Sequence, residues 1–344
     1  MIRDVKYRVH VLRSGAYLTE LDWNADNPPK ITMKASGAIK CSMEGTFLLN
    51  DRINWYRDEL QPVVIIDGVE SSLGIFRPTT VTTAEESFTK TVTVSAYDRC
   101  WLASTTKTES LLHLSAGDGY IETIKKLLQA CGIVNVIAAP SAATLPADRE
   151  DWQTGTSYLT IVNDLLAEIG FNDLWFDADG LAHLEKYSAP SATAIKRRYG
   201  ARDLLLPMGR DWSDETDVFD APNVFVCICD NADRSATLTA TAENTSFGAK
   251  SILSRGMRIA QVTKVKQIAD QESLQAYADK LCNESLLGTR EITFYTPVNP
   301  GHGVGDIISI DHDDIGGIYQ ETGWNVELET GASMKITAKR SVIL

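Results

Sequence analysis

The stretch GTREITFYTPVNPGHGVGDIISI (residues 288–310), followed after a loop by WNVELETGASMKITAKR (residues 324–340), decides the fold of this chain. In its first part Ile292, Phe294 and Thr296 occupy every second position. Such alternation is the period of a strand with one face buried. The C-terminal region is therefore predicted to be β-structure.

Three more strands are expected in this stretch. Gly305 and Asp306 introduce one strand, and the turn at Thr330–Gly331 separates the other two. Four short strands joined by tight turns predict a small antiparallel barrel or sandwich. Because no helix follows the glycines, a nucleotide-binding loop is not expected. We interpret the stretch as a β-module against which other copies and partners dock.

Composition and charge restrict the function classes. The 344 residues are 44% hydrophobic and 23% charged, as in ordinary globular proteins, and the net charge is −13. This acidity argues against a general nucleic-acid binder and against an anionic membrane surface as partner. It leaves open a negatively lined channel through which DNA passes without sticking.

Targeting signals and cysteines point to a reducing compartment. The sequence contains no run of about 18 apolar residues, and its N-terminus has no apolar signal core, so we expect a cytoplasmic site of synthesis and no membrane insertion. No Cys-x-x-Cys motif occurs, and the cysteines are interpreted as small buried hydrophobes. They are Cys41, Cys100, Cys131, Cys227, Cys229 and Cys282.

The order of patterns predicts an α+β fold that is predominantly β. Two small β-barrel-like domains flank a small α/β domain, with a helix inserted before the last barrel strands. The expected segments are a first β-barrel-like domain at 1–103, an α/β domain with two helix–strand units at 104–205, the start of the second β-barrel-like domain with inserted strands at 206–268, a helix packing on the α/β region at 269–288, and the rest of the second barrel at 289–344.

Local patterns support this division. The first hundred residues alternate repeatedly and contain the strong hairpin turn Asp67–Gly68, which predicts about eight short strands. Two helices are then predicted from matching apolar stripes that begin at Ile121 and Leu159, a repeat of 38 residues that indicates an internal duplication. Further on, the strand 223–229 is apolar on both faces and is expected to be central, and Asp270 caps a third helix.

Four stretches together resemble a known family. They are AYDR at 96–99, the helix and aspartate–glycine hairpin at 156–180, the segment 198–205 followed by 223–226, and the helix, strand and Gly-Asp-Ile start at 273–310. In this order they resemble phage tail baseplate hubs or tail-tip hubs, a fold that also forms the N-terminal structural part of tail-associated lysins. The resemblance spans almost the whole chain.

The resemblance implies a structural virion protein and no enzymatic activity. It implies a homotrimer whose two barrels per chain form a pseudo-hexameric ring, which joins the tail tube or distal tail protein above to a spike or fibre protein below. The ring would enclose a channel in which DNA is only passing cargo. The protein would lie at the virion tail tip after assembly in the bacterial host cytoplasm. Because the sequence ends at Leu344 after the last barrel strand, no appended lytic domain is expected.

No catalytic, cofactor-binding or metal-binding residue is predicted, although several motifs have a functional alternative. The glycine run 301–305 could cradle a phosphate, but we interpret it as a turn. Cys227 and Cys229 could bind a metal, but buried packing fits them better. The His312–Asp314 run is interpreted as a solvated loop, and Asp177 with Asp179 as a hairpin turn and not a calcium loop.

Two charged runs carry further alternatives. The acidic run Asp211–Asp220 is interpreted as a solvated loop, with a channel-lining or partner-facing role as the alternative. The basic cluster Lys196–Arg198 with Arg202 is interpreted as a solvated strand end. Its alternative is an intersubunit salt-bridge site against those acids, although exposed ion pairs contribute little stability. The net charge also predicts a ring lumen of negative potential.

Two other function classes remain possible at this stage. The first is a cell-wall or polysaccharide hydrolase, which needs two facing carboxylates in a cleft. The second is a receptor- or carbohydrate-binding tail module, for which exposed indoles would provide the binding platforms. The candidate platforms are Trp23, Trp55, Trp152, Trp212 and Trp324.

Overall fold

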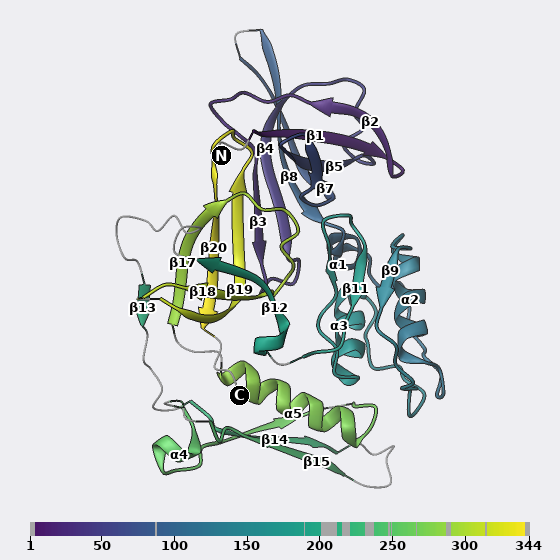
Figure 1. The fold of residues 1–344 in the computed structure, drawn as a ribbon. Helices are drawn as coiled ribbons and strands as arrows, with labels where there is room; N and C mark the ends of the chain where they lie inside the picture. The colour runs from purple at the N-terminus through teal and green to yellow at the C-terminus, as the bar shows by residue number, and fades with distance from the viewer. Residues whose placement is uncertain are drawn as a thin grey trace.

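A computed structural model describes residues 4–86, 88–188, 190–200, 212–214, 221–230, 237–246, 248, 250–265, 267–286, 290–313 and 315–340. The chain is predominantly β with few helices, which confirms the predicted fold class. The described strands form three sheets, one of them large (Figure 1). Among the described residues, none of the helices combines the length and apolar character needed to cross a membrane.

The large sheet has 14 strands, drawn from both ends of the chain. Strands β1 to β8 come from the first hundred residues, and the other six all follow residue 194, in two groups at 195–214 and 290–340. The strands are β1 (Val5–Arg13), β2 (Ala16–Leu21), β3 (Lys30–Lys34), β4 (Cys41–Leu48), β5 (Glu59–Ile66), β6 (Val69–Ser72), β7 (Phe76–Glu86), β8 (Thr89–Asp98), β12 (Ile195–Gly200), β13 (Trp212–Asp214), β17 (Arg290–Pro297), β18 (Ile307–Asp311), β19 (Gly317–Glu327) and β20 (Ser333–Arg340).

The two β-regions meet at the antiparallel pair β3–β19, where Met33 lies opposite Trp324. The strand order along the sheet is β13-β17-β20-β19-β3-β4-β8-β7-β5-β1-β2, with β12, β18 and β6 attached beside this path. Both regions also contribute to one hydrophobic core, which includes Phe47 and Phe76 from the first region and Phe294 from the second. The path stays open from β13 to β2, so the described strands form no closed barrel.

Local turn chemistry explains how the strands connect. Asp67 and Gly68 both have positive φ, 51° and 85°, which suits the tight turn that joins β5 to β6. The predicted turn at Gly331 (φ 86°) likewise joins β19 to β20. These two hairpins are confirmed, and β19 is longer than predicted because it already begins at Gly317.

The second unit contains the two predicted helices, each followed by a short strand. Helices α2 (Tyr120–Ala130) and α3 (Tyr158–Glu168) begin 38 residues apart, and each buries its apolar stripe in a second core. Ser157 caps α3 by accepting a hydrogen bond from the Thr160 N–H. The remaining elements are α1 (Cys100–Thr105), β9 (Val136–Ala138), β10 (Trp175–Phe176), β11 (Ala182–Leu184) and the short 3-10 helix Ala192–Ala194.

The third unit is a three-stranded sheet covered by one helix. Strand β14 (Val224–Cys229) lies between β15 (Leu238–Glu243) and β16 (Ala260–Lys264), which confirms its predicted central position. Helix α5 (Gln271–Leu286) packs on β14 and β15 and also contacts α3. This helix was expected to pack on the α/β region, but most of its buried face lies on the three-stranded sheet. Helix α4 (Ile252–Arg255) precedes β16.

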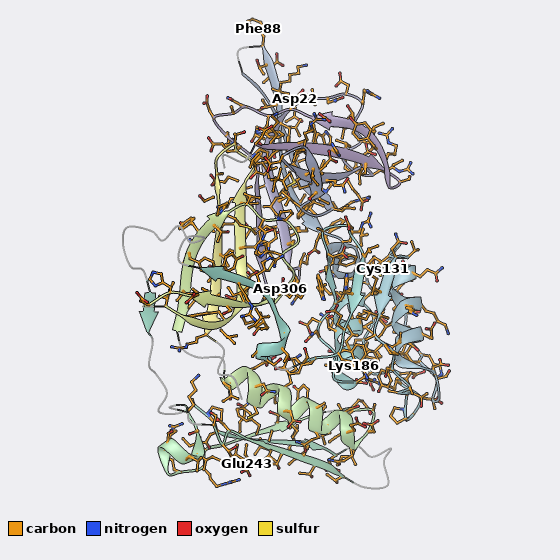
Figure 2. All side chains as sticks on the ribbon, in the orientation of Figure 1. Asp22, Phe88, Cys131, Lys186, Glu243 and Asp306 are labelled. Atoms are coloured by element: carbon orange, nitrogen blue, oxygen red, sulfur yellow. The ribbon has the colours of Figure 1, made fainter. Side chains whose placement is uncertain are left out.

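The arrangement of the units leaves one hairpin projecting from the body. In Figure 1 the second unit lies beside the large sheet, the third unit lies below both, and the β7–β8 hairpin rises at the top. Strand β7 pairs with β5 only at Phe76, so the next residues of β7 have no strand on that side among those described. Figure 2 places Phe88 at the hairpin tip, where its side chain is 99% exposed.

Candidate interaction sites

The glycine run 301–305 forms a loop that is organised by Asp306. The Asp306 carboxylate accepts a hydrogen bond from the Gly303 N–H at 3.0 Å. A Cβ atom added to Gly303 would lie 2.7 Å from the nearer Asp306 oxygen, so only glycine fits at this close approach. The loop leads into β18, as the turn interpretation predicted. Gly303 provides the backbone contact with Asp306, and the Gly301 carbonyl accepts a hydrogen bond from Arg197.

Part of the predicted basic cluster pairs with the same aspartate. Lys196 Nζ lies 2.7 Å from one Asp306 oxygen, and Arg197 lies 3.0 Å from the other. Burial acts to raise the pKa of Asp306, but the hydrogen bonds from Lys196 and Gly303 outweigh it and lower the pKa overall. These cations therefore have a partner within the chain. Arg198 is exposed, and Arg202 lies outside the described residues, as does most of the acidic run.

A second pair lies completely inside the protein. His302 Nδ1 lies 2.8 Å from a Glu321 oxygen, and both side chains are buried. Within the described part of the chain, His302 Nε2, the other Glu321 oxygen and Trp324 Nε1 have no hydrogen-bond partner. These polar groups hold the 301–305 loop against β19. Sequence reasoning did not find this pair, because nothing local connects His302 to Glu321.

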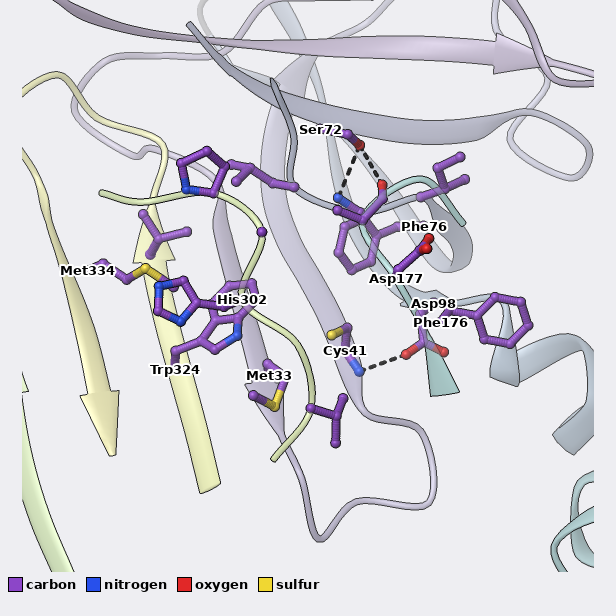
Figure 3. Close-up of a pocket in the computed structure, with 18 of the residues that line it drawn as sticks. Met33, Cys41, Ser72, Phe76, Asp98, Phe176, Asp177, His302, Trp324 and Met334 are labelled. Carbon is purple, nitrogen blue, oxygen red and sulfur yellow. Dashed lines mark hydrogen bonds between the residues drawn. The ribbon is translucent and has the colours of Figure 1, made fainter. Parts of the chain in front are cut away.

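Figure 3 shows the narrow cavity lined by His302 and Trp324, where loop 298–304 meets β3 and the β10–β11 hairpin. Its lining is mostly apolar, with Met33, Trp324 and Met334 on one side. On the other side Asp98 accepts a hydrogen bond from the Cys41 N–H at 2.8 Å. Burial raises the pKa of Asp98 to about 6. The lining also includes Asp177, whose carboxylate lies 2.8 Å from His183 Nε2. The cavity is a junction between units, and both of these aspartates have hydrogen-bond partners within the chain.

The remaining candidate ligands have structural roles in the described chain. Cys227 and Cys229 are both buried against α5, in the same core as Cys282, as the packing interpretation predicted. Asp177 accepts hydrogen bonds from the backbone of residues 179 and 181 and therefore closes its own hairpin turn. Among the described residues, no group of three or more His, Cys, Asp or Glu side chains is placed to hold a metal ion.

The tryptophans expected as platforms for a carbohydrate are largely covered. Trp152 is 6% exposed and Trp324 is 7% exposed. Trp23 and Trp55 are half-buried against the main core. The side chain of Trp212 lies outside the described set. The indoles therefore contribute mainly to packing.

A groove lined by arginines opens between the first β-region and the second unit. Its guanidinium groups come from four separate segments, and they are those of Arg13, Arg57, Arg77 and Arg99. The groove has a volume of about 460 Å³ and is completed by the turn that follows α2, including Val134. We call it the arginine groove. No sequence pattern predicted this groove, because the four arginines are far apart along the chain.

Two of the four arginines are neutralised by carboxylates. Arg13 binds Asp58 through two nitrogens at 2.8 and 2.7 Å, and this contact lowers the pKa of Asp58. Arg99 binds Glu59 in the same bidentate way. Arg77 donates only to backbone carbonyls, at 2.9 and 2.7 Å. The Arg57 side chain forms no hydrogen bond or ion pair with any described residue, although its charge also helps to lower the pKa of the neighbouring Asp58. The groove therefore contains two guanidinium groups, those of Arg57 and Arg77, that form no ion pair with a described carboxylate.

Comparison with known proteins identifies the fold. No protein-family model matches the chain, and no curated protein sequence matches it. The structure is similar to a tail protein from Neisseria meningitidis MC58, with 14% identity, 97% of each chain covered and a TM-score of 0.66. It is also similar to the 43 kDa tail protein of a Shewanella oneidensis prophage, with 12% identity, 97% and 98% coverage and a TM-score of 0.64.

A third solved structure extends the same likeness. A prophage tail protein from Listeria monocytogenes EGD-e aligns at 12% identity over 96% of this chain and 94% of that one, with a TM-score of 0.57. The chain therefore has the fold of phage tail proteins over nearly its whole length. This agrees with the resemblance found in the sequence.

Proposed function

We propose that this chain is a structural component of a phage tail or a phage-like particle, located at the tail tip as the baseplate hub. The observation that carries the proposal is the fold likeness to prophage tail proteins, which covers 97% of this chain and 97% of the Neisseria protein. A likeness of this extent includes all three units and not just one common domain.

In the finer proposal, three copies form a ring. Each chain contributes two β-regions, so three copies contain six of them and can match a hexameric tube above and a threefold spike or fibre below. The β3–β19 pair supports this arrangement, because it joins the two β-regions into one sheet and fixes their relative orientation. The shared core adds rigidity to the same joint.

The ring would enclose the channel through which DNA passes. The net charge of −13 favours a lumen that repels the DNA backbone and does not retain it. The projecting β7–β8 hairpin, with an unpaired outer edge and an exposed tip, is suited to contact a neighbouring tail protein along the axis. We propose the tube or distal tail protein and the spike or fibre protein as these axial neighbours.

The oligomeric state and the ring geometry test this proposal. Light scattering should give the mass of three chains, and negative-stain electron microscopy should show rings with near-sixfold outlines. A monomer at micromolar concentration would contradict the hub. Zymography on cell-wall and polysaccharide substrates provides the companion measurement, and we expect no clearing. Clearing would favour a hydrolase instead.

A further inference from the structure

We propose that the arginine groove receives the acidic segment Asp211–Asp220 from a second copy of this chain. The inference rests on the proposed homotrimer and names the contact that would hold neighbouring copies together. It differs from the intersubunit alternative expected from the sequence, because the cations Lys196 and Arg197 are already paired with Asp306 inside the chain.

The charge of the groove requires an anionic occupant. In a protein of net charge −13, a groove lined by four arginines, two of which have no ion pair with a described carboxylate, is a local exception. Arg57 is exposed and has its donors available to a carboxylate from outside. A guanidinium can bind a carboxylate through two parallel hydrogen bonds, so an arginine-lined groove favours carboxylates over single-point acceptors.

The acidic segment matches this requirement in both charge and polarity. The sequence DWSDETDVFD at 211–220 contains five carboxylates and no basic residue. It also contains Val218 and Phe219, which suit the apolar part of the groove wall near Val134, a side chain that is 68% exposed. Burial of that valine by a partner would remove apolar surface from water.

The topology places the groove and strand β13, the described part of the segment, at opposite ends of the large sheet. Strand β13, which contains residues 212–214 of the segment, is the first strand in the sheet order, whereas Arg13 ends β1 beside the last strand, β2. Figure 1 shows β13 and the β1–β2 end on opposite sides of the protein. A closed ring is built from contacts between different faces of successive copies, so one end of each copy meets the other end of the next.

The test is a charge-swap series measured by sedimentation velocity on the full chain. Arg57→Glu alone, and Arg57→Glu with Arg77→Glu, should raise the trimer dissociation constant by about tenfold or more, because like charges would then meet across the interface. The double change Asp214→Arg with Asp217→Arg should weaken the trimer in the same way. Combining both pairs should restore association.

A matched control separates this contact from overall charge. Lys126→Glu with Lys186→Glu changes the net charge by the same amount at two exposed positions outside the groove, and should leave the trimer unchanged. Arg57→Glu removes no bond within the described protein, so it remains informative if the Arg77 change perturbs folding. Circular dichroism checks the fold of every variant.

The outcomes distinguish the two proposals. If the wild type is a trimer and the Arg57 variants assemble equally well, the proposed contact at the arginine groove is refuted, whereas the proposed trimeric ring is not. If the groove variants weaken the trimer but the combined charge swap does not restore it, the groove binds a different acidic segment. That outcome would overturn the assignment of Asp211–Asp220 as the occupant. A monomeric wild type would overturn both the ring and the contact.

Discussion

Arg99 holds both carboxylate oxygens of Glu59, at 3.0 and 2.8 Å, and donates from its remaining nitrogen to the Gly180 carbonyl at 2.9 Å. Glu59 begins β5, Arg99 follows β8, and Gly180 belongs to the β10–β11 hairpin. One side chain therefore joins the first β-region to the second unit. The contact is only slightly exposed, so solvent screens it weakly.

Arg99→Ala should destabilise the protein by about 3 kcal/mol, because it leaves the buried Glu59 carboxylate without its cation. Chemical denaturation followed by tryptophan fluorescence measures the change. Arg8→Ala is the control, because its pair with Glu20 is exposed, and it should change stability by less than about 1 kcal/mol. Equal effects of the two changes would contradict the role given to Arg99.

Asp98 should make the protein less stable as pH rises from about 4 to about 6. Its pKa is raised by burial from 3.8 to about 6, so the folded state binds the proton more tightly than the unfolded state. The contribution is fully present below the unfolded pKa and is lost as pH rises through the folded pKa. The shift of the Asp98 pKa from 3.8 to about 6 corresponds to a stability contribution of at most about 3 kcal/mol.

Asp98→Asn cannot ionise, and it should remove this part of the pH dependence. Denaturation midpoints of the variant and the wild type, measured at several pH values, give the difference directly. The variant should lose stability relative to the wild type at low pH, because only the wild type gains stability there from protonation of the buried carboxylate. Parallel pH curves for the two proteins would refute the assignment.

Asp306→Asn should have the opposite pH signature. The pKa of Asp306 is lowered, so its contribution is present above the unfolded pKa and is lost as pH falls through the folded pKa. At neutral pH the variant should lose about 3 kcal/mol, because two cations lose their anion. The difference in the free energy of unfolding between wild type and variant should become smaller at acidic pH, as measured by denaturation at several pH values. A difference that stays constant with pH would show that lost packing alone causes the destabilisation.

Phe88→Gly should not destabilise the folded chain. Phe88 is 99% exposed and has a φ of 65°, a left-handed conformation that glycine adopts without steric cost. Relief of this strain should offset the added flexibility of glycine, so the thermal midpoint should stay within a few degrees of the wild type. A large drop in the midpoint would show that the hairpin tip is anchored within the chain.

The local elements could be predicted from sequence because their determinants are local. Alternation defined β17 and β20, the Asp67–Gly68 pair defined the β5–β6 hairpin, and the matching apolar stripes defined α2 and α3. Order along the chain also supported the likeness to tail hubs. The longer β19 was not predicted, because Thr322 and Gly323 interrupt its alternation and a bulge accommodates them.

The sequence by itself determined the predominantly β character, the hairpins and the two helices α2 and α3, since strand period, turn residues and apolar stripes act over a few residues. Only the tertiary structure decided that β3 pairs with β19. It also decided that Lys196 binds Asp306, which lies 110 residues away in the sequence, and that four distant arginines line one groove. Such contacts depend on which strand edges remain open and which charges can be buried together, and both are properties of the assembled core.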